Sequence, residues 1–262
     1  MSGVEGRVAL VTGAGSAGGI GFATARLLRA AGAKVAITST TDRIFERLED
    51  LGGEPGETFA KPADLTDSAM VTSLIEEVKD SLGSIDIIVN NAGQMQVGRD
   101  EPWLPLYQMS DDNWRYAMDI NLTSAFSITR AVLPGMMEHK YGRIVHMSSV
   151  TGPVVGIETA AAYSAAKAGM LGMARTLAIE VGPFKVTVNC VGPGWIDTGA
   201  LGEDSLTAGR HTPVGRPGRP EEIGHVAVFL ASEEASYITG QLIIVDGGNT
   251  IQEFKVALEG SG

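Results

Sequence analysis

Short apolar runs alternate with longer amphipathic segments along this chain up to about residue 245. The runs are continuous, which is typical of strands buried on both faces of a parallel sheet. The longer segments carry apolar residues at helical spacing, so each one can act as a crossover between parallel strands. The pattern predicts an α/β fold with a doubly wound, central parallel sheet of about seven strands flanked by helices. The strand runs include residues 8–11, 35–37, 85–89, 144–147, 186–189 and 242–245, and the helical segments include 23–31, 68–82, 111–137, 160–181 and 220–231.

No stretch of linker-like composition interrupts this rhythm, so we expect a single domain over residues 1–262. Hydrophobic residues make up 44% of the chain and charged residues 19%, which is enough apolar material for a sizeable core. Residues 94–109 and 199–218 lack a regular pattern and are candidate substrate loops, or else ordinary surface loops. Residues 249–262 follow the last expected strand, are not needed to complete the sheet, and form a C-terminal tail.

The formal net charge of -11 argues against two classes of partner. Nucleic acid and anionic membrane surfaces would both be repelled by the average surface of the protein, so we expect neither. The single cysteine, Cys190, excludes an internal disulfide and a cysteine-cluster metal site, and its apolar neighbours predict the buried end of a strand. No metal site is expected. The absence of a secretory pattern and of a long apolar run predicts a cytoplasmic protein.

A glycine-rich stretch follows the first strand and precedes the first helix. Glycines there let the backbone approach a pyrophosphate closely, and the following helix offers its N-terminal amides. This context predicts dinucleotide binding and a Rossmann-type domain; the alternative is a tight strand-to-helix turn. No Gly-Lys-Ser/Thr follows, which argues against NTP hydrolysis. The candidate cofactor-binding residues of this stretch are Gly13, Gly15, Ser16, Gly19, Ile20 and Gly21.

Polar and small residues follow later strands at the same expected edge of the sheet. Asp64 and Leu65 follow the third strand, where an aspartate can accept a hydrogen bond from an adenine amine. Asn91, Ala92 and Gly93 follow the fourth strand, where small residues let a cofactor pass close to the backbone. Taken singly, each group is also what a helix cap or a turn requires.

Tyr163 and Lys167 lie four residues apart in an alanine-rich segment that favours a helix. This spacing places both side chains on one helical face. A lysine ammonium beside a phenol favours the phenolate, which makes the tyrosine a usable proton donor or acceptor nearer neutral pH. The alternative is the edge of an amphipathic helix, with the lysine stem extending toward solvent.

Together these motifs resemble the short-chain dehydrogenase/reductase family, and within it the 3-oxoacyl carrier-protein reductases and other ketoreductases. The resemblance covers residues 6–250, with the motifs in the family's order. It rests on the glycine-rich turn, Asn90-Asn91-Ala92-Gly93, Asn121, Ser149, Tyr163 with Lys167, Pro193-Gly194, and Val245-Asp246-Gly247-Gly248.

The resemblance implies roles for individual side chains. Tyr163 would be the general acid in ketone reduction and the general base in alcohol oxidation. Lys167 would hold the nicotinamide ribose, Ser149 would hydrogen-bond the substrate carbonyl, and Asn121 would anchor a water in the proton relay. The remaining implied cofactor contacts are Pro193, Gly194, Ile196 and Thr198 at the nicotinamide, Asn91, Ala92 and Gly93 at the adenosine ribose, and Asp64 with Leu65 at the adenine.

Two departures from the family pattern leave alternatives open. Gly13 and Gly19 are separated by two residues more than is usual, so the amides that meet the pyrophosphate are not fixed. Ser149 precedes Tyr163 by one residue more than is common, so the intervening loop must bulge and Ser148 is the alternative carbonyl donor.

The end of the second strand should decide between NADP(H) and NAD(H). An acidic residue at this tip would bind the ribose 2′-hydroxyl and repel a 2′-phosphate, but the tip carries Ser39, Thr40 and Thr41 instead. Arg43 offers a positive charge to a phosphate, so NADP(H) is preferred, with NAD(H) as the alternative. The same hydroxyls would also suit the cap of the helix that begins near Asp42.

The predicted function is reversible, NAD(P)H-dependent reduction of a ketone or 3-oxoacyl-type carbonyl of a small-molecule substrate to a secondary alcohol. The alternatives are an NAD-dependent secondary-alcohol dehydrogenase and, remotely, a non-catalytic dinucleotide-binding scaffold. Enoyl reductases of the superfamily place more residues between tyrosine and lysine, which disfavours double-bond reduction here. The family implies a homotetramer or homodimer that pairs through the helices at 111–137 and 160–181 and the last strand.

Overall fold

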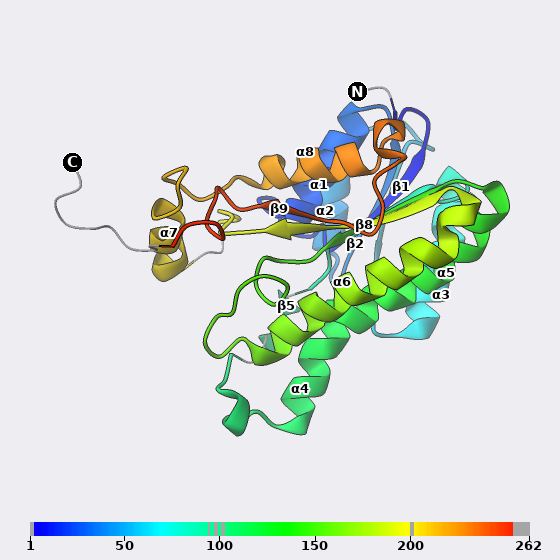
Figure 1. Ribbon diagram of the computed structural model, residues 1–262. Coiled ribbons are helices and arrows are strands. Elements are labelled where there is room, and N and C mark those ends of the chain that lie inside the picture. The colour runs from blue at the N-terminus through cyan, green and yellow to red at the C-terminus, as the bar shows by residue number, and fades with distance from the viewer. Residues whose placement is uncertain (1–2, 94, 97–98, 101–102, 200–201, 254–262) are drawn as a thin grey trace.

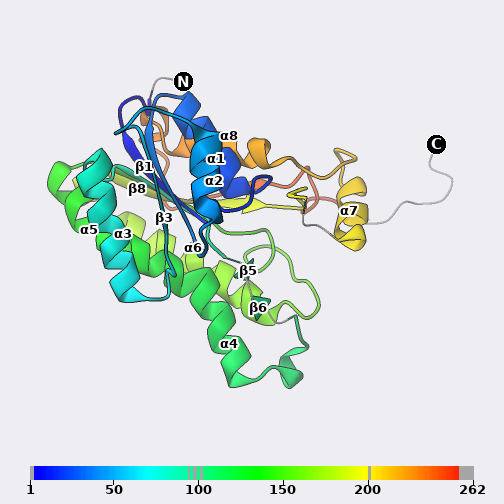
Figure 2. The same cartoon turned by 180° about the vertical axis from the view of Figure 1, so that it is seen from behind.

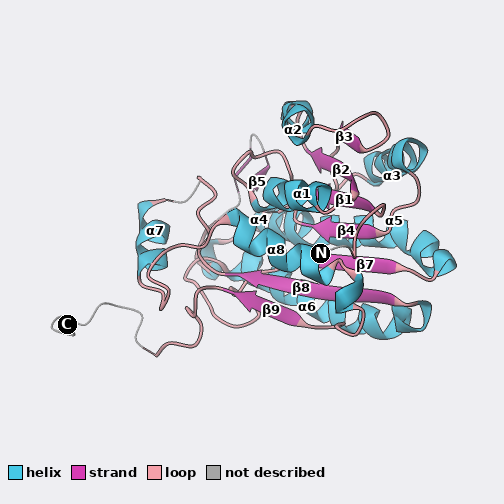
Figure 3. Cartoon of the chain, turned by 90° about the horizontal axis from the view of Figure 1, so that it is seen from above, coloured by secondary structure: helices cyan, strands magenta, loops and turns pink. Residues whose placement is uncertain are grey.

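The computed structural model describes residues 3–93, 95–96, 99–100, 103–199 and 202–253. Its centre is a seven-stranded parallel sheet made of β1 (Val8–Thr12), β2 (Lys34–Ser39), β3 (Thr58–Pro62), β4 (Ile87–Asn90), β7 (Gly142–Met147), β8 (Val186–Pro193) and β9 (Leu242–Val245). The spatial order is β3-β2-β1-β4-β7-β8-β9, so the strand order reverses beside β1 (Figure 3). This arrangement confirms the predicted doubly wound, Rossmann-type sheet.

Helices cover both faces of the sheet (Figures 1 and 2). One layer holds α1 (Ile20–Ala30), α2 (Arg43–Leu51) and α8 (Pro220–Leu230), and the other holds α3 (Ser68–Leu82), α5 (Ser124–His139) and α6 (Ala161–Val181). Val8 and Leu10 of β1 pack into the apolar cluster of the second layer, whereas Ala9 and Val11 pack into the cluster of the first. Burial on both faces explains why the strand sequences are continuously apolar.

The segment expected as one helix over residues 111–137 is interrupted. It forms α4 (Asp111–Met118), a π-helical turn η2 (Asp119–Thr123) and then α5. Ser110 caps α4 because its hydroxyl accepts a hydrogen bond from the Asn113 amide. The π-helical turn contains Asn121, and such turns occur often at functional sites because they redirect a side chain.

Both candidate substrate loops contain regular structure. Residues 199–218, which we expected to be irregular, include α7 (Glu203–Arg210), and this helix lies beyond the carboxyl ends of β8 and β9 (Figure 1). Residues 94–109 include the short antiparallel strands β5 (Met95–Gln96) and β6 (Arg99–Asp100) and the 3-10 turn η1 (Leu106–Gln108). Two further 3-10 turns, η3 (Gly182–Phe184) and η4 (Glu233–Ala235), precede β8 and β9.

Cys190 lies in the middle of β8, opposite Leu242 of β9, and not at the end of a strand as we expected. The strand extends beyond its apolar run to Gly192 and Pro193. Glycine and proline are uncommon inside strands, so the sequence pattern placed the end of this strand too early. Within the described residues, every helix is too short or too polar to cross a bilayer.

Candidate active site

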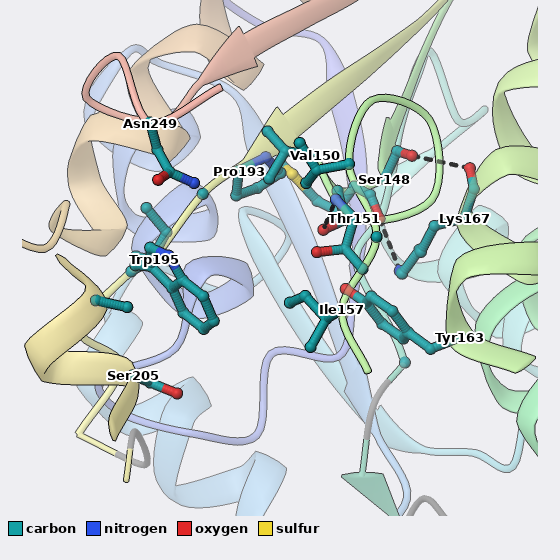
Figure 4. Close-up of a pocket in the computed structure, with 18 of the residues that line it drawn as sticks. Ser148, Val150, Thr151, Ile157, Tyr163, Lys167, Pro193, Trp195, Ser205 and Asn249 are labelled. Atoms are coloured by element: carbon teal, nitrogen blue, oxygen red, sulfur yellow. Dashed lines mark hydrogen bonds between the residues drawn. The ribbon is translucent and has the colours of Figure 1, made fainter. Parts of the chain in front are cut away.

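A cavity of about 800 Å³ opens at the carboxyl ends of β4, β7 and β8. Figure 4 shows Tyr163 and Lys167 on one side of it and Trp195, Ser205 and Asn249 on the other. The cavity therefore lies where parallel α/β sheets usually bind ligands. The lining residues that the sequence predicted as catalytic or cofactor-binding are Ile20, Asn91, Gly93, Ser149, Tyr163, Lys167, Pro193, Gly194, Ile196 and Thr198.

Tyr163 and Lys167 project from the first turns of α6 into this cavity. The Lys167 ammonium lies 5.5 Å from the centroid of the Tyr163 ring and donates a hydrogen bond to the Met147 carbonyl at 2.9 Å. Lys167 is only 5% exposed, so it does not form a solvated helix edge. The ammonium therefore lies beside the phenol ring, and a positive charge close to a phenol favours the phenolate.

The two serines at the end of β7 make different hydrogen bonds. Ser148 donates to the backbone carbonyl of Lys167 at 3.0 Å and so ties the end of the strand to α6. The Ser149 oxygen accepts a hydrogen bond from the Thr151 amide at 3.0 Å. A hydroxyl that accepts in this way can still donate its own proton to a ligand, which makes Ser149 the better placed donor.

Asn121 lies behind the cavity wall and is fully buried. Its side-chain amide donates to the Ala117 carbonyl at 3.0 Å. A Cβ atom added to Gly93 would lie 2.7 Å from Asn121 Oδ1 and 3.5 Å from Lys167 Nζ, so these two polar groups approach Gly93 closely. The structure thus brings Asn121 to the vicinity of Lys167, although Asn121 does not line the cavity itself.

The glycine-rich turn is held tightly against the segment that follows β4. Asn91 donates from its side chain to the carbonyls of Thr12 and Gly13, at 3.2 and 3.0 Å. Gly13 has a φ of 67°, and a Cβ atom there would lie 2.7 Å from Ala92 Cα. A Cβ on Gly21 would lie 2.6 Å from the Gly13 carbonyl. The packing of the turn therefore requires glycine at these positions even without a ligand.

The start of α1 has the features of an anion site. Its N-cap residue, Gly19, provides no side-chain hydrogen bond, and no acidic residue lies in the first turn. The turn also passes next to the end of β2, because a Cβ on Gly15 would lie 2.8 Å from Ser39 Cβ. The backbone amides and the dipole of α1 therefore suit the diphosphate of a dinucleotide.

The end of β2 is open enough to bind a ligand group. Ser39 donates to the Thr41 carbonyl at 3.1 Å, and the exposed Arg43 donates to the Thr41 hydroxyl at 3.4 Å. Thr40 is exposed, as is Asp42, whose side chain does not cap α2. These contacts hold the Ser39 and Thr41 hydroxyls and the Arg43 guanidinium close together at the carboxyl end of β2.

Two predicted adenine contacts have local structural roles. Asp64 accepts hydrogen bonds from the Thr66 amide at 2.9 Å and from the Thr66 hydroxyl at 2.7 Å, as in a turn. Leu65 is 5% exposed and its side chain packs in the core with α3. Only the backbone of Leu65 can therefore face a cofactor.

A buried polar pair lies beneath the site. The Asn90 side chain approaches His146 Nδ1 at 3.1 Å and donates to the Thr129 hydroxyl at 3.0 Å. Burial lowers the pKa of His146 from 6.5 to about 4, and the nearby Lys167 charge adds to this effect. Burial likewise raises the pKa of the Cys190 thiol to about 12, so it is no candidate nucleophile.

Several lining residues were not singled out as candidate site residues. Trp103 belongs to a candidate substrate loop, and its ring lies 5.6 Å from the Tyr163 ring. The others come from the loop before α6 and the segment after β9, which carry no motif or period that marks them, and from α7, which lies within the candidate substrate loop 199–218. They are Thr151, Ile157, Glu158, Thr159, Asp204, Ser205, Ala208 and Asn249. Within the described residues, no group of three or more His, Cys, Asp or Glu side chains is arranged to hold a metal ion.

Comparison with known proteins identifies the family. The sequence profile of a family described as Enoyl-(Acyl carrier protein) reductase matches residues 13–250. A solved structure of a Serratia marcescens short-chain dehydrogenase/reductase mutant superposes with a TM-score of 0.83 at 31% identity, over 95% of this chain and 99% of that one. The chain belongs to the short-chain dehydrogenase/reductase family.

Relatives of this short-chain dehydrogenase/reductase extend over nearly its whole length. The 3-oxoacyl-[acyl-carrier-protein] reductase FabG of Vibrio cholerae is 42% identical over 249 residues, which is 94% of this chain and 98% of the relative. The FabG protein of Escherichia coli is 41% identical, over 93% and 97% of the two chains. Oxidoreductase UcpA of Salmonella typhimurium is 36% identical, over 97% and 98%. Membership in this family makes the protein an oxidoreductase.

Proposed function

We propose that this protein reduces a ketone, including 3-oxoacyl-type carbonyls, to a secondary alcohol with NADPH, and that it works in both directions. The observation that carries the proposal is the convergence of Ser149, Tyr163 and Lys167 on one cavity whose other wall is formed by the segment from Pro193 to Ile196. The names of the FabG relatives support the 3-oxoacyl substrate class and a dehydrogenase/reductase reaction.

The residues of this chain fit a nicotinamide dinucleotide, which supplies the hydride when bound. The uncapped amino end of α1 and the glycine turn would hold the diphosphate. Lys167 would hold the nicotinamide ribose, and Pro193 and Gly194 would contact the ring from the end of β8. The other proposed cofactor contacts are Gly13, Gly15, Ser16, Gly19, Ile20, Gly21, Ser39, Thr40, Arg43, Asp64, Leu65, Asn91, Ala92, Gly93, Tyr163, Ile196 and Thr198.

Tyr163 would donate its phenolic proton to the carbonyl oxygen as negative charge develops there. Ser149 would donate a hydrogen bond to the same oxygen and so polarise the carbonyl. The Lys167 ammonium, 5.5 Å from the phenol ring, would stabilise the phenolate that remains. In alcohol oxidation the same phenolate would accept the substrate's proton.

Asn121 would hold a water that returns a proton to Tyr163 by way of Lys167. Two contacts support this role: Asn121 Oδ1 and Lys167 Nζ both lie close to Gly93, and the side-chain amide of Asn121 is fixed by the Ala117 carbonyl. A fixed, buried amide oxygen is a suitable acceptor for an ordered water.

The preference for NADPH is tested with Arg43→Gln and with Arg115→Gln as a control on the exposed surface of α4. Removing a charge-assisted contact to a 2′-phosphate should lower kcat/KM for NADPH about tenfold and leave that for NADH nearly unchanged. Steady-state rates with each cofactor at low concentration provide the measurement. Equal or faster turnover of the unmodified protein with NADH would instead favour the NAD-dependent alcohol dehydrogenase.

The family profile's description raises reduction of a carbon–carbon double bond as a second candidate. NADPH oxidation should be compared between a 3-oxoacyl thioester and the matching 2-enoyl thioester. The proposal expects turnover of the first and little of the second. Binding of NADPH without turnover across ketones, aldehydes and thioesters would point to a non-catalytic scaffold.

We also infer assembly into a homotetramer or homodimer. Strand β9 is an edge strand, and Ile244 on it is 41% exposed. Phe126 of α5 and Ile179 of α6 are 43% and 81% exposed, so apolar surface is available on the other expected interface. Light scattering during size-exclusion chromatography tests this, and a monomeric mass at micromolar concentration would contradict it.

A further inference from the structure

The charges that line the cavity are unevenly distributed. Among the described lining residues, three have charged side chains: Glu158, Lys167 and Asp204. Lys167 is buried and its ammonium is bound to the Met147 carbonyl. Among the lining residues that the structure describes, the charged side chains left to face a substrate are therefore both carboxylates.

The two carboxylates come from different elements. Glu158 is exposed in the loop that leads from β7 to α6, two residues before α6's N-cap residue Ala160. Asp204 is exposed in the first turn of α7, beyond the end of β8. Arg210 of α7 pairs with Glu203 at 3.0 Å, and among the described residues no ion pair joins Glu158 or Asp204 to a cation.

Apolar side chains also line the cavity, together with neutral polar side chains such as Thr159, Ser205 and Asn249. Trp103 borders the phenol of Tyr163, Ile157 lies near it, and Trp195 lies on the opposite side (Figure 4). Apolar walls lower the local dielectric constant, which strengthens the effect of a nearby charge. A negatively charged substrate group placed here would lose part of its hydration and meet like charge.

We propose that Glu158 and Asp204 are specificity-determining residues that make the cavity select neutral or cationic ketones over ketones with a negative charge near the carbonyl. This inference rests on the proposed ketone reduction and names the charge class of its substrate. At low ionic strength, for an assumed separation of about 8 Å and an effective dielectric constant of about 40, a carboxylate lowers the binding of an anionic group by about fivefold.

The test uses three substrates with the same 3-oxobutanoyl group: acetoacetate as the anion, ethyl acetoacetate as the neutral ester and acetoacetylcholine as the cation. With NADPH saturating, the protein should show a higher kcat/KM for the ester and the cation than for acetoacetate. Raising the salt concentration should narrow the difference between acetoacetate and acetoacetylcholine, because salt screens exposed charges.

Glu158→Gln and Asp204→Asn remove each charge while keeping nearly the same shape. Each should raise the ratio of kcat/KM for acetoacetate to kcat/KM for ethyl acetoacetate by about fivefold, and the double variant should raise it further. Glu76→Gln, on the exposed surface of α3, removes one charge far from the cavity and should leave the ratio unchanged.

The outcomes separate this inference from the proposed function. Reduction of ethyl acetoacetate with an unchanged ratio in the double variant would overturn the inference and leave the reductase function standing. A ratio that rises equally in Glu76→Gln would also overturn it, because net charge alone would then explain the effect. No reduction of any of the three compounds by the unmodified protein would overturn the inference, and failure to reduce the 3-oxoacyl thioester as well would overturn the proposed function.

Discussion

The buried histidine beneath the site should make folding stability depend on pH. His146 is fully buried in β7, opposite Asn90 of β4 in the sheet register, and its Nδ1 lies 3.1 Å from the Asn90 side chain. Burial, with a contribution from the Lys167 charge, lowers its pKa from 6.5 to about 4. Folding therefore keeps this imidazole neutral at a pH where it would be protonated in the unfolded chain.

The sign and size of the effect follow from linkage. Because the native pKa is depressed, the stability that comes from a neutral His146 is fully present above pH 6.5 and falls as the pH drops toward 4. Each pH unit in this window corresponds to about 1.4 kcal/mol. Between pH 7.5 and pH 5.0, the protein should lose about 2 kcal/mol of its free energy of unfolding through this residue alone.

The assay is urea unfolding at pH 7.5 and pH 5.0, at one fixed protomer concentration, for the unmodified protein and for His146→Gln. The variant can still accept a hydrogen bond from Asn90, and it removes the titrating group. Its stability at pH 7.5 should be lower because a packed ring is lost, but its decrease toward pH 5.0 should be about 2 kcal/mol smaller. An equal decrease in the two proteins would refute the reasoning.

The remaining predictions concern a thiol and two glycines. Cys190 should react with iodoacetamide at pH 8 about a thousandfold more slowly in the native protein than in urea, because burial raises its pKa to about 12; comparable rates would show that β8 is accessible. Gly13→Ala should destabilise the fold by about 2 kcal/mol or more, by thermal or urea unfolding, because its φ is 67° and the new Cβ would lie 2.7 Å from Ala92 Cα. The matched control, Gly172→Ala in α6, has no atom within 4 Å of the new Cβ and should be neutral or stabilising by up to about 1 kcal/mol; similar losses in both variants would contradict the argument.

The sheet was predictable because its signal repeats along the whole chain. Each strand is buried on both faces, so its sequence is a short apolar run, and each crossover helix carries an apolar stripe at helical spacing. Helix α3, from Ser68 to Leu82, has the bounds that its pattern predicts, since Asp67 caps its start and Gly83 follows its end.

Features that depend on contacts between distant segments were not predictable. The π-helical turn at Asn121 has the same apolar spacing as the α-helix on either side, so the sequence indicates one helix. Helix α7 is short and polar, and its segment resembles a loop in composition. The segment 199–218 was a candidate substrate loop from its sequence, and the structure adds that part of it is a helix that lines the cavity.

The candidate active site was likewise predictable from the sequence only in part. The spacing of Tyr163 and Lys167 placed both side chains on one face, as the structure has them. Ser148 and Ser149 are adjacent hydroxyls that the sequence pattern does not distinguish, and the structure adds that they have different hydrogen-bond partners. Leu65 was expected beside the cofactor from its place after a strand, whereas its side chain packs in the core.

The central claim is that Tyr163 moves the proton in carbonyl reduction, and Tyr163→Phe tests it most directly. The variant keeps the ring that lies 5.6 Å from Trp103 and removes only the hydroxyl. Stopped-flow reduction of ethyl acetoacetate should slow by at least about a hundredfold, while NADPH titrated by fluorescence should bind with a Kd within about threefold of the unmodified protein. Unchanged turnover in a variant that still binds NADPH would contradict the account.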